Sequence, residues 1–309
     1  MNIRHLTLTL LAMACASSIH IASLAQTTPE LTAEIITVSV KGAGPSGEVA
    51  MPVHVFKPSL TNPAAGNGPW PVVIFSHGRA ATPEERANVK NPVPFGHVRF
   101  WHAKGYAVIA PIRPGYGGNG ADVEVAGISF PANGGPCTGR PDFNKVATVA
   151  TDAVRSAHTW LLEQSWVNKE RILLLGQSVG GFTTVAACGQ NWPGVVGCIN
   201  FAGGVSGNPK TSPNASCQPE RLGEVFAAAG KTTRAPSLWL YSENDTYWGP
   251  AVPKQWHKAH VDAATAAGQP SPAEFFAAPP VEPDGHTLFL RGGKFWSPEL
   301  NAWLKKHGF

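Results

Sequence analysis

Apolar residues follow one another without clear alternation in six short runs of the chain. These runs cover residues 71–78, 106–112, 171–177, 194–203, 236–245 and 273–280. Strands that are apolar on both faces are typical of a parallel sheet covered by helices. Ahead of them, residues 33–40 and 51–58 alternate apolar and polar positions around a Gly-Pro-Ser-Gly turn, which predicts an antiparallel hairpin.

Helical periodicity occurs between these runs. Residues 142–164 place their apolar side chains on one stripe, with the spacing of an amphipathic helix. The C-terminal segment 297–308 predicts a second helix, with Ser297 as its cap and Pro298 in its first turn. Strands that alternate with helices predict an α/β class protein with a doubly wound, mostly parallel sheet and an antiparallel N-terminal hairpin.

One hydroxyl lies between glycines where a predicted strand turns into a helix. The segment Gly176-Gln177-Ser178-Val179-Gly180 follows the apolar run 171–175, and small apolar residues at helical density follow it. A Gly-x-Ser-x-Gly pattern in this strand-turn-helix setting is the nucleophile elbow of serine hydrolases. We interpret Ser178 as a nucleophile rather than as a serine in an ordinary tight turn.

A serine nucleophile needs a nearby base and an acid that orients the base. In this architecture the chain order is serine, acid, histidine. Asp245 follows the predicted strand at 238–242, and His286 lies in a loop after the strand at 273–280. Glu243 is the competing acid, but Asp245 lies in the turn itself and is the residue we favour.

The oxyanion of the reaction needs two hydrogen-bond donors. We expect one to be the backbone N–H of Val179, at the start of the helix whose dipole favours negative charge. The other is expected from Arg79, because His77-Gly78-Arg79 has the His-Gly-x form at the end of the predicted strand 71–78. His77 itself precedes the nucleophile and stands on the wrong strand for the base, so we interpret it as a residue that shapes this loop.

Together these features resemble the α/β-hydrolase superfamily, and most closely its secreted dienelactone-hydrolase-like esterases. The resemblance rests on the hairpin and on four motifs in order, at 77–79, 176–180, 243–245 and 284–286. It implies an α/β-hydrolase fold with Ser178, Asp245 and His286 as the triad. Dienelactone hydrolases proper carry a cysteine at the nucleophile position, where this chain has serine, so a lactone substrate does not follow from the resemblance.

The predicted function is hydrolysis of carboxylic esters by a serine esterase. Polyester hydrolases and cutinases share two of the motifs but usually carry an aromatic residue where this chain has Arg79. A serine peptidase of the prolyl-oligopeptidase type is a second enzymatic alternative, and a binding protein without turnover is the alternative from another class.

Small or aromatic soluble esters are the expected substrates. The segment 203–235, where large lipases often insert an apolar lid, is polar here. We expect Tyr116, Tyr247 and Trp248 to form the pocket walls and to bind substrate, with Arg79 at the rim.

Composition narrows the remaining functions. The formal net charge is +4 and the basic residues are dispersed, which does not favour nucleic-acid binding. Residues 115–120 match Gly-x-Gly-x-x-Gly but do not open a helix, so nicotinamide binding is not predicted. No cofactor or metal is expected, and a small-molecule ester is the only partner predicted.

The N-terminus has the features of a secretory signal peptide. Arg4 precedes an apolar stretch from Leu6 to about Ala16. The small-residue pattern Ser23-Leu24-Ala25 follows it and predicts cleavage after residue 25. The mature chain, 26–309, is then a single catalytic domain that is secreted or periplasmic and has no membrane segment.

Export also bears on the cysteines that remain after cleavage. Their number is even, and an oxidising compartment favours disulfides. From their places along the predicted elements we expect Cys137 to pair with Cys217 and Cys188 with Cys198.

Overall fold

The computed structural model describes residues 31–42, 47–131, 135–269 and 272–309. The predicted signal peptide, residues 1–25, lies outside the described residues. Among the helices of the described part, none is both long and apolar enough to cross a membrane.

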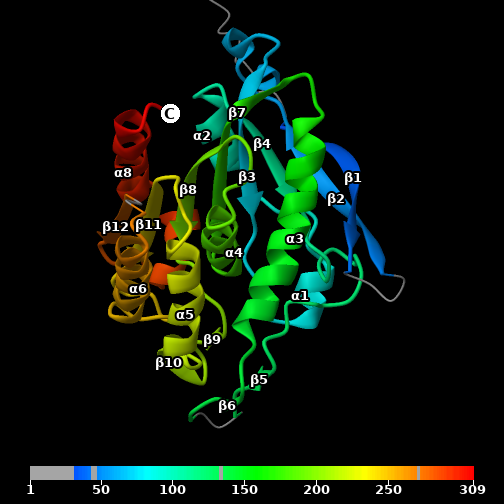
Figure 1. Cartoon of the computed structure of the whole chain (residues 1–309). Helices are drawn as coiled ribbons and strands as arrows, with labels where there is room; N and C mark the ends of the chain where they lie inside the picture. Colours follow the sequence, from blue (N-terminus) through cyan, green and yellow to red (C-terminus); the bar gives the residue numbers. More distant parts are fainter. Residues whose placement is uncertain (1–30, 43–46, 132–134, 270–271) are drawn as a thin grey trace, which may run out of the picture. The chain divides into compact units, whose positions relative to one another are not determined.

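An eight-stranded sheet runs through residues 34–278 (Figure 1). The two N-terminal strands form an antiparallel hairpin, and the second of them pairs antiparallel with β4; the remaining pairs are parallel. In spatial order the strands are β1 (Glu34–Lys41), β2 (Glu48–Phe56), β4 (Ala107–Pro111), β3 (Trp70–Ser76), β7 (Val167–Gln177), β8 (Val195–Phe201), β11 (Ser237–Ser242) and β12 (Ala273–Ala278). The predicted hairpin and mostly parallel sheet are confirmed.

Helices bury both faces of this sheet. Along β3, Val73 and Phe75 join a core with α2 (Phe95–His102) and α8 (Gly293–Lys306), whereas Val72 and Ile74 join a core with α3 (Phe143–Leu162) and α4 (Val179–Cys188). This alternation explains why the strand runs are continuously apolar, because each face has its own helical cover. A third core lies among α3, α4, α5 (Pro219–Gly230) and α6 (Val252–Ala266).

The C-terminal helix begins earlier than Ser297. It starts at Gly293 and contains Pro298 in its interior. Trp296 is 6% exposed and packs on the ring of Phe201, which holds the extra turn in helical form. The predicted Ser297 cap is therefore wrong, because burial of an aromatic residue outweighed the local signals of serine and proline.

Short elements occupy the connections. They are η1 (Pro58–Leu60), η2 (Pro63–Ala65), α1 (Pro83–Ala87), β5 (Ile128–Ser129), β6 (Thr138–Gly139), β9 (Gly207–Asn208), β10 (Ser212–Ser216), η3 (Gly285–Thr287) and α7 (Leu288–Arg291).

Disulfides join Cys137 to Cys217 and Cys188 to Cys198, as predicted. The first ties the loop before α3 to the loop before α5, and the second ties the end of α4 to β8.

The loops that follow β3, β7, β11 and β12 leave the sheet from the carboxyl ends of parallel strands. Such ends lie at one edge of a sheet, where α/β proteins bind ligands. Each of these four loops carries a residue that the sequence singled out: Arg79, Ser178, Asp245 and His286.

Candidate active site

Ser178 has a backbone conformation that few residues adopt. Its φ is 57° and its ψ is −123°, directly between β7 and α4. A Cβ on Gly176 would lie 2.0 Å from the carbonyl oxygen of Gly180, and one on Gly180 would lie 1.9 Å from the carbonyl oxygen of Ser76. The turn is therefore possible only with glycine at both positions.

The three side chains that chain order singled out lie together. His286 Nε2 is 3.0 Å from Ser178 Oγ, and His286 Nδ1 is 3.0 Å from Asp245 Oδ2. Since a carboxylate only accepts hydrogen bonds, Nδ1 carries the proton and Nε2 faces the hydroxyl as an acceptor. This arrangement can take the proton of Ser178.

Asp245 is held by its own turn. It has no exposed surface, and its Oδ1 accepts the backbone N–H of Tyr247 at 2.8 Å and that of Trp248 at 3.2 Å. Oδ2 is thereby left to His286. Glu243, the competing acid, is exposed. Among the described residues, its side chain makes no hydrogen bond to His286.

A second aspartate joins the acid and base loops. Asp284 Oδ1 accepts the N–H of Thr246 at 3.0 Å and the N–H of His286 at 2.9 Å, and its Oδ2 accepts the Thr246 hydroxyl at 2.8 Å. Burial alone would raise the pKa of Asp284, but the hydrogen bonds from His286 and Thr246 outweigh it and hold this pKa below its usual range. Sequence reasoning missed this role, although Asp284 stands two residues before the histidine in an Asp-Gly turn.

Gly285 allows the two loops to come this close. A Cβ at this position would lie 2.5 Å from the backbone nitrogen of Asp245. The N–H of Gly285 donates to the carbonyl oxygen of Asn244 at 3.1 Å, and the Asn244 side chain pairs with both backbone groups of Val281. The histidine loop is thus fastened to the acid turn at several points.

The two predicted oxyanion donors stand on either side of the nucleophile turn. Val179 is the first residue of α4, where helix N–H groups have no carbonyl partner within the helix. On the other side, a Cβ on Gly78 would lie 3.3 Å from Ser178 Cβ, so the turn that carries Arg79 packs against the serine. The donor roles of Val179 and Arg79 remain predictions.

His77 is part of the support of this turn. Burial, and then the charge of Arg113, lower the pKa of His77 well below its usual range, so the ring stays neutral. Its Nδ1 donates to the Gly78 carbonyl oxygen at 2.8 Å, and its Nε2 accepts the backbone N–H of Arg113 at 3.2 Å. The Arg113 guanidinium also donates to the His77 carbonyl oxygen at 2.9 Å.

A buried ion pair fixes that guanidinium. Arg113 has no exposed surface, and its Nη2 donates to Glu124 Oε2 at 3.2 Å. Glu124 also accepts the hydroxyl of Tyr116 at 2.8 Å. Paired and hydrogen-bonded in this way, the two charges are tolerated in the interior. Ten residues without helical or strand periodicity separate Arg113 from Glu124, so the sequence alone does not pair them.

Two of the predicted pocket walls need correction. Tyr116 has no exposed surface because its hydroxyl reaches the buried Glu124, and Trp248 is 2% exposed because its indole N–H donates to the Ala202 carbonyl oxygen at 2.8 Å. Neither offers a surface to a substrate. Trp248 instead packs edge-on against the His286 ring, at 5.6 Å between ring centroids.

The predicted rim residue, Arg79, and the third predicted wall residue, Tyr247, have different outcomes. The Arg79 guanidinium is not a free cation, because Asp122 binds it through both oxygens, with Nη1 at 2.9 Å from Oδ1. Tyr247 is half-buried and stacks on His286, with 4.0 Å between ring centroids. Its contact with substrate stays a prediction.

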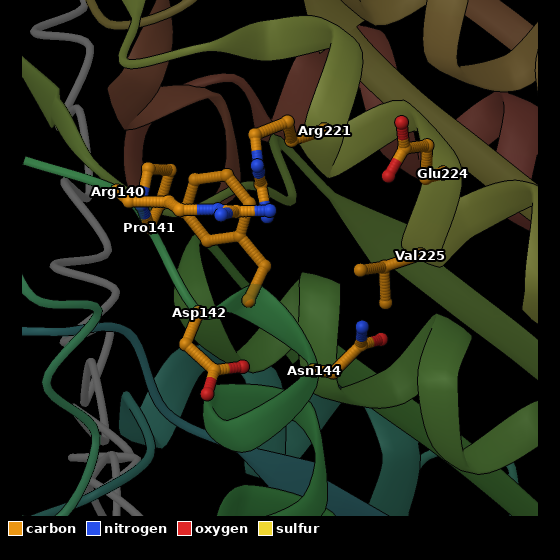
Figure 2. A pocket seen from close by; sticks show the side chains of 8 residues that line it. Arg140, Pro141, Asp142, Asn144, Arg221, Glu224 and Val225 are labelled. Atoms are coloured by element: carbon orange, nitrogen blue, oxygen red, sulfur yellow. The ribbon is translucent and has the colours of Figure 1, made fainter.

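A separate pocket of about 360 Å³ lies where α3 and α5 begin. Figure 2 shows its lining side chains, which include the cations Arg140 and Arg221 and the anions Asp142 and Glu224. No member of the Ser178 site lines it. Within the described ranges, no group of three or more His, Cys, Asp or Glu side chains is placed to hold a metal ion.

Comparison with solved structures identifies the architecture as the α/β-hydrolase fold. Esterase Pf2001 of Pyrococcus furiosus matches with a TM-score of 0.57 at 11% identity, over 91% of this chain and 92% of that one. A puromycin-hydrolyzing peptidase of Mycobacterium tuberculosis matches with a TM-score of 0.54 at 17% identity, and the acylaminoacyl peptidase of Pyrococcus horikoshii with 0.53 at 15%.

The two peptidases are much longer than the region they share with this protein. Each match covers 84% of this chain, but only 38% and 39% of the peptidase chains. No protein-family model and no curated protein sequence matches the chain. At these identities the comparisons show a common fold, and the chemistry has to be argued from the site.

Proposed function

We propose that the protein is a serine hydrolase that cleaves carboxylic esters through an acyl-enzyme on Ser178. The observation that carries the proposal is the unbroken hydrogen-bonded chain from Ser178 through His286 to the buried Asp245, with both distances at 3.0 Å. The constellation of nucleophile, base and orienting acid is recognised by its geometry.

The proposed reaction has two halves. Ser178 Oγ attacks the ester carbonyl while His286 Nε2 takes its proton, and the oxyanion accepts hydrogen bonds from the backbone N–H groups of Val179 and Arg79. His286 then gives the proton to the departing alcohol. Water, activated by the same nitrogen, cleaves the acyl-enzyme and frees Ser178.

Ester rather than amide cleavage is supported by the match with an esterase along most of both chains. Several similar structures are named as peptidases, so a peptidase is the second candidate. Small or aromatic soluble esters remain the proposed substrates. Export to an oxidising compartment is also proposed, and the two disulfides support it.

Labelling with a fluorophosphonate, followed by peptide mapping, tests the mechanism. We expect modification of Ser178, and none in a folded Ser178→Ala variant. An unlabelled Ser178 in folded wild-type protein would contradict the proposal.

Rates on p-nitrophenyl esters are expected to fall as the acyl chain lengthens, without a jump at an emulsion interface. Faster cleavage of aminoacyl p-nitroanilides than of the matching esters would favour the peptidase.

A further inference from the structure

A cavity of about 330 Å³ borders the nucleophile turn. Its lining includes Gly78 and Gln177. Gln177 precedes Ser178 in the chain, and a Cβ on Gly78 would lie 3.3 Å from Ser178 Cβ. The volume is at the lower end of the range for cavities that bind small molecules. The cavity therefore borders the turn that carries Ser178.

The walls of this cavity are mostly apolar. Phe75, Val93 and Phe289 form part of the lining and are at most 3% exposed, whereas Phe95 is 39% and Leu290 is 62% exposed. The Phe289 ring is fixed by stacking on Phe75, with 5.2 Å between centroids. A rigid apolar lining with large apolar side chains exposed to solvent is typical of a surface that covers an apolar ligand.

The place of the cavity identifies which part of an ester it faces. His286 lies in η3, and α7 continues directly from it. Phe289 and Leu290 therefore follow His286 by only three and four residues. His286 has to protonate the oxygen of the departing alcohol, so the alcohol lies on the histidine side of Ser178. α7, which continues from the histidine loop, forms one wall of the cavity.

We propose that this cavity binds the alcohol part of the substrate and selects apolar alcohols, aryl or branched alkyl, over small polar ones. The inference rests on the proposed ester hydrolysis. Burial of one additional ring or branched group against such walls is expected to favour acylation by roughly tenfold or more over a methyl ester. The prediction from sequence placed the pocket walls at Tyr116, Tyr247 and Trp248 and did not include Phe95 or Leu290.

Two substrate series separate the alcohol side from the acyl side. The first varies the alcohol in methyl, isobutyl and benzyl acetates, and the second varies the acid in methyl acetate, butyrate and phenylacetate. Phe95→Ala and Leu290→Ala are expected to lower kcat/KM for benzyl acetate about three- to tenfold more than for methyl acetate. The rate of deacylation should be the same for all three acetates, because each of them gives the same acetyl-enzyme.

Ile35→Ala is the matched control. Ile35 is as exposed as Leu290, at 62%, but lies on the edge strand β1, so its loss should leave the alcohol preference unaltered. A preference unchanged in both cavity variants, or a loss that follows the acyl group instead, overturns the subsite. If either of these outcomes is found while the wild-type protein is labelled at Ser178 and hydrolyses esters, only the subsite is rejected. If it is neither labelled nor active, the proposed function fails with it.

Discussion

At the scale of single residues, the two ring nitrogens of His286 have different partners, and this difference sets the tautomer. Asp245→Asn would present an amide to Nδ1 and favour the wrong tautomer. We expect kcat for p-nitrophenyl acetate to fall by about 10³–10⁴ with little change in the melting temperature. Glu243→Gln is the control and should stay within about twofold of wild type. The opposite ranking of these two variants would show that the acid is misassigned.

Asp284 gives a pH-dependent prediction. Its folded-state pKa lies below the unfolded value of about 3.9, so its ionised form contributes stability above that pH and loses it as the pH falls through the folded pKa. Asp284→Asn should therefore lower the free energy of unfolding at pH 6 and reduce its decline between pH 5 and pH 3. Urea unfolding at several pH values measures this. An unchanged slope would mean that Asp284 does not hold the two loops together.

The proximity of the three side chains could be predicted because the nucleophile motif and the order of the residues can be read directly from the sequence. Ser178, Asp245 and His286 each follow a strand that the apolar pattern had already located. The environment of Tyr116 and Arg79 depends on Glu124 and Asp122, which contact them only after the loop has folded. Burial of a loop side chain cannot be deduced without knowing such partners.

At the scale of elements, the join between β7 and α4 brings backbone segments very close together. Gly180→Ala would place a Cβ 1.9 Å from a backbone oxygen of β3, which cannot rotate away. We expect a loss of about 1–3 kcal/mol in the free energy of unfolding, together with loss of activity. Gly96→Ala is the control, because nothing lies within 4 Å of a Cβ there and the residue is in α2. Chemical denaturation of both variants makes the comparison, and equal stabilities would argue against the close approach.

The strands were the easiest elements to predict and the helix ends the hardest. Continuous apolar runs identify strands because both faces of this sheet are covered. The start of α8 depends instead on Trp296, whose burial against Phe201 joins segments far apart in the sequence. A cap signal is local, and a tertiary contact of this kind overrides it.

At the scale of the whole molecule, the two disulfides constrain very different lengths of chain. Their cysteines are 80 residues apart in Cys137–Cys217 and 10 apart in Cys188–Cys198. Loop-closure entropy assigns about 4.5 kcal/mol to the first and about 2.8 kcal/mol to the second. Replacing each pair by serine should therefore cost more stability for Cys137 and Cys217, as measured by guanidinium unfolding. A larger loss for the shorter loop would indicate that packing around α4 dominates.

The cavity beside Ser178 is built from two parts of the chain that differ in how freely they can change. Leu290 lies four residues after His286 in one short segment, so a change in the backbone of α7 would affect the position of the base. Phe95 stands on α2, which carries no member of the triad. During divergence, new alcohol preferences are therefore expected to arise first through residues 91–95, while residues 288–291 vary only as far as the reaction tolerates.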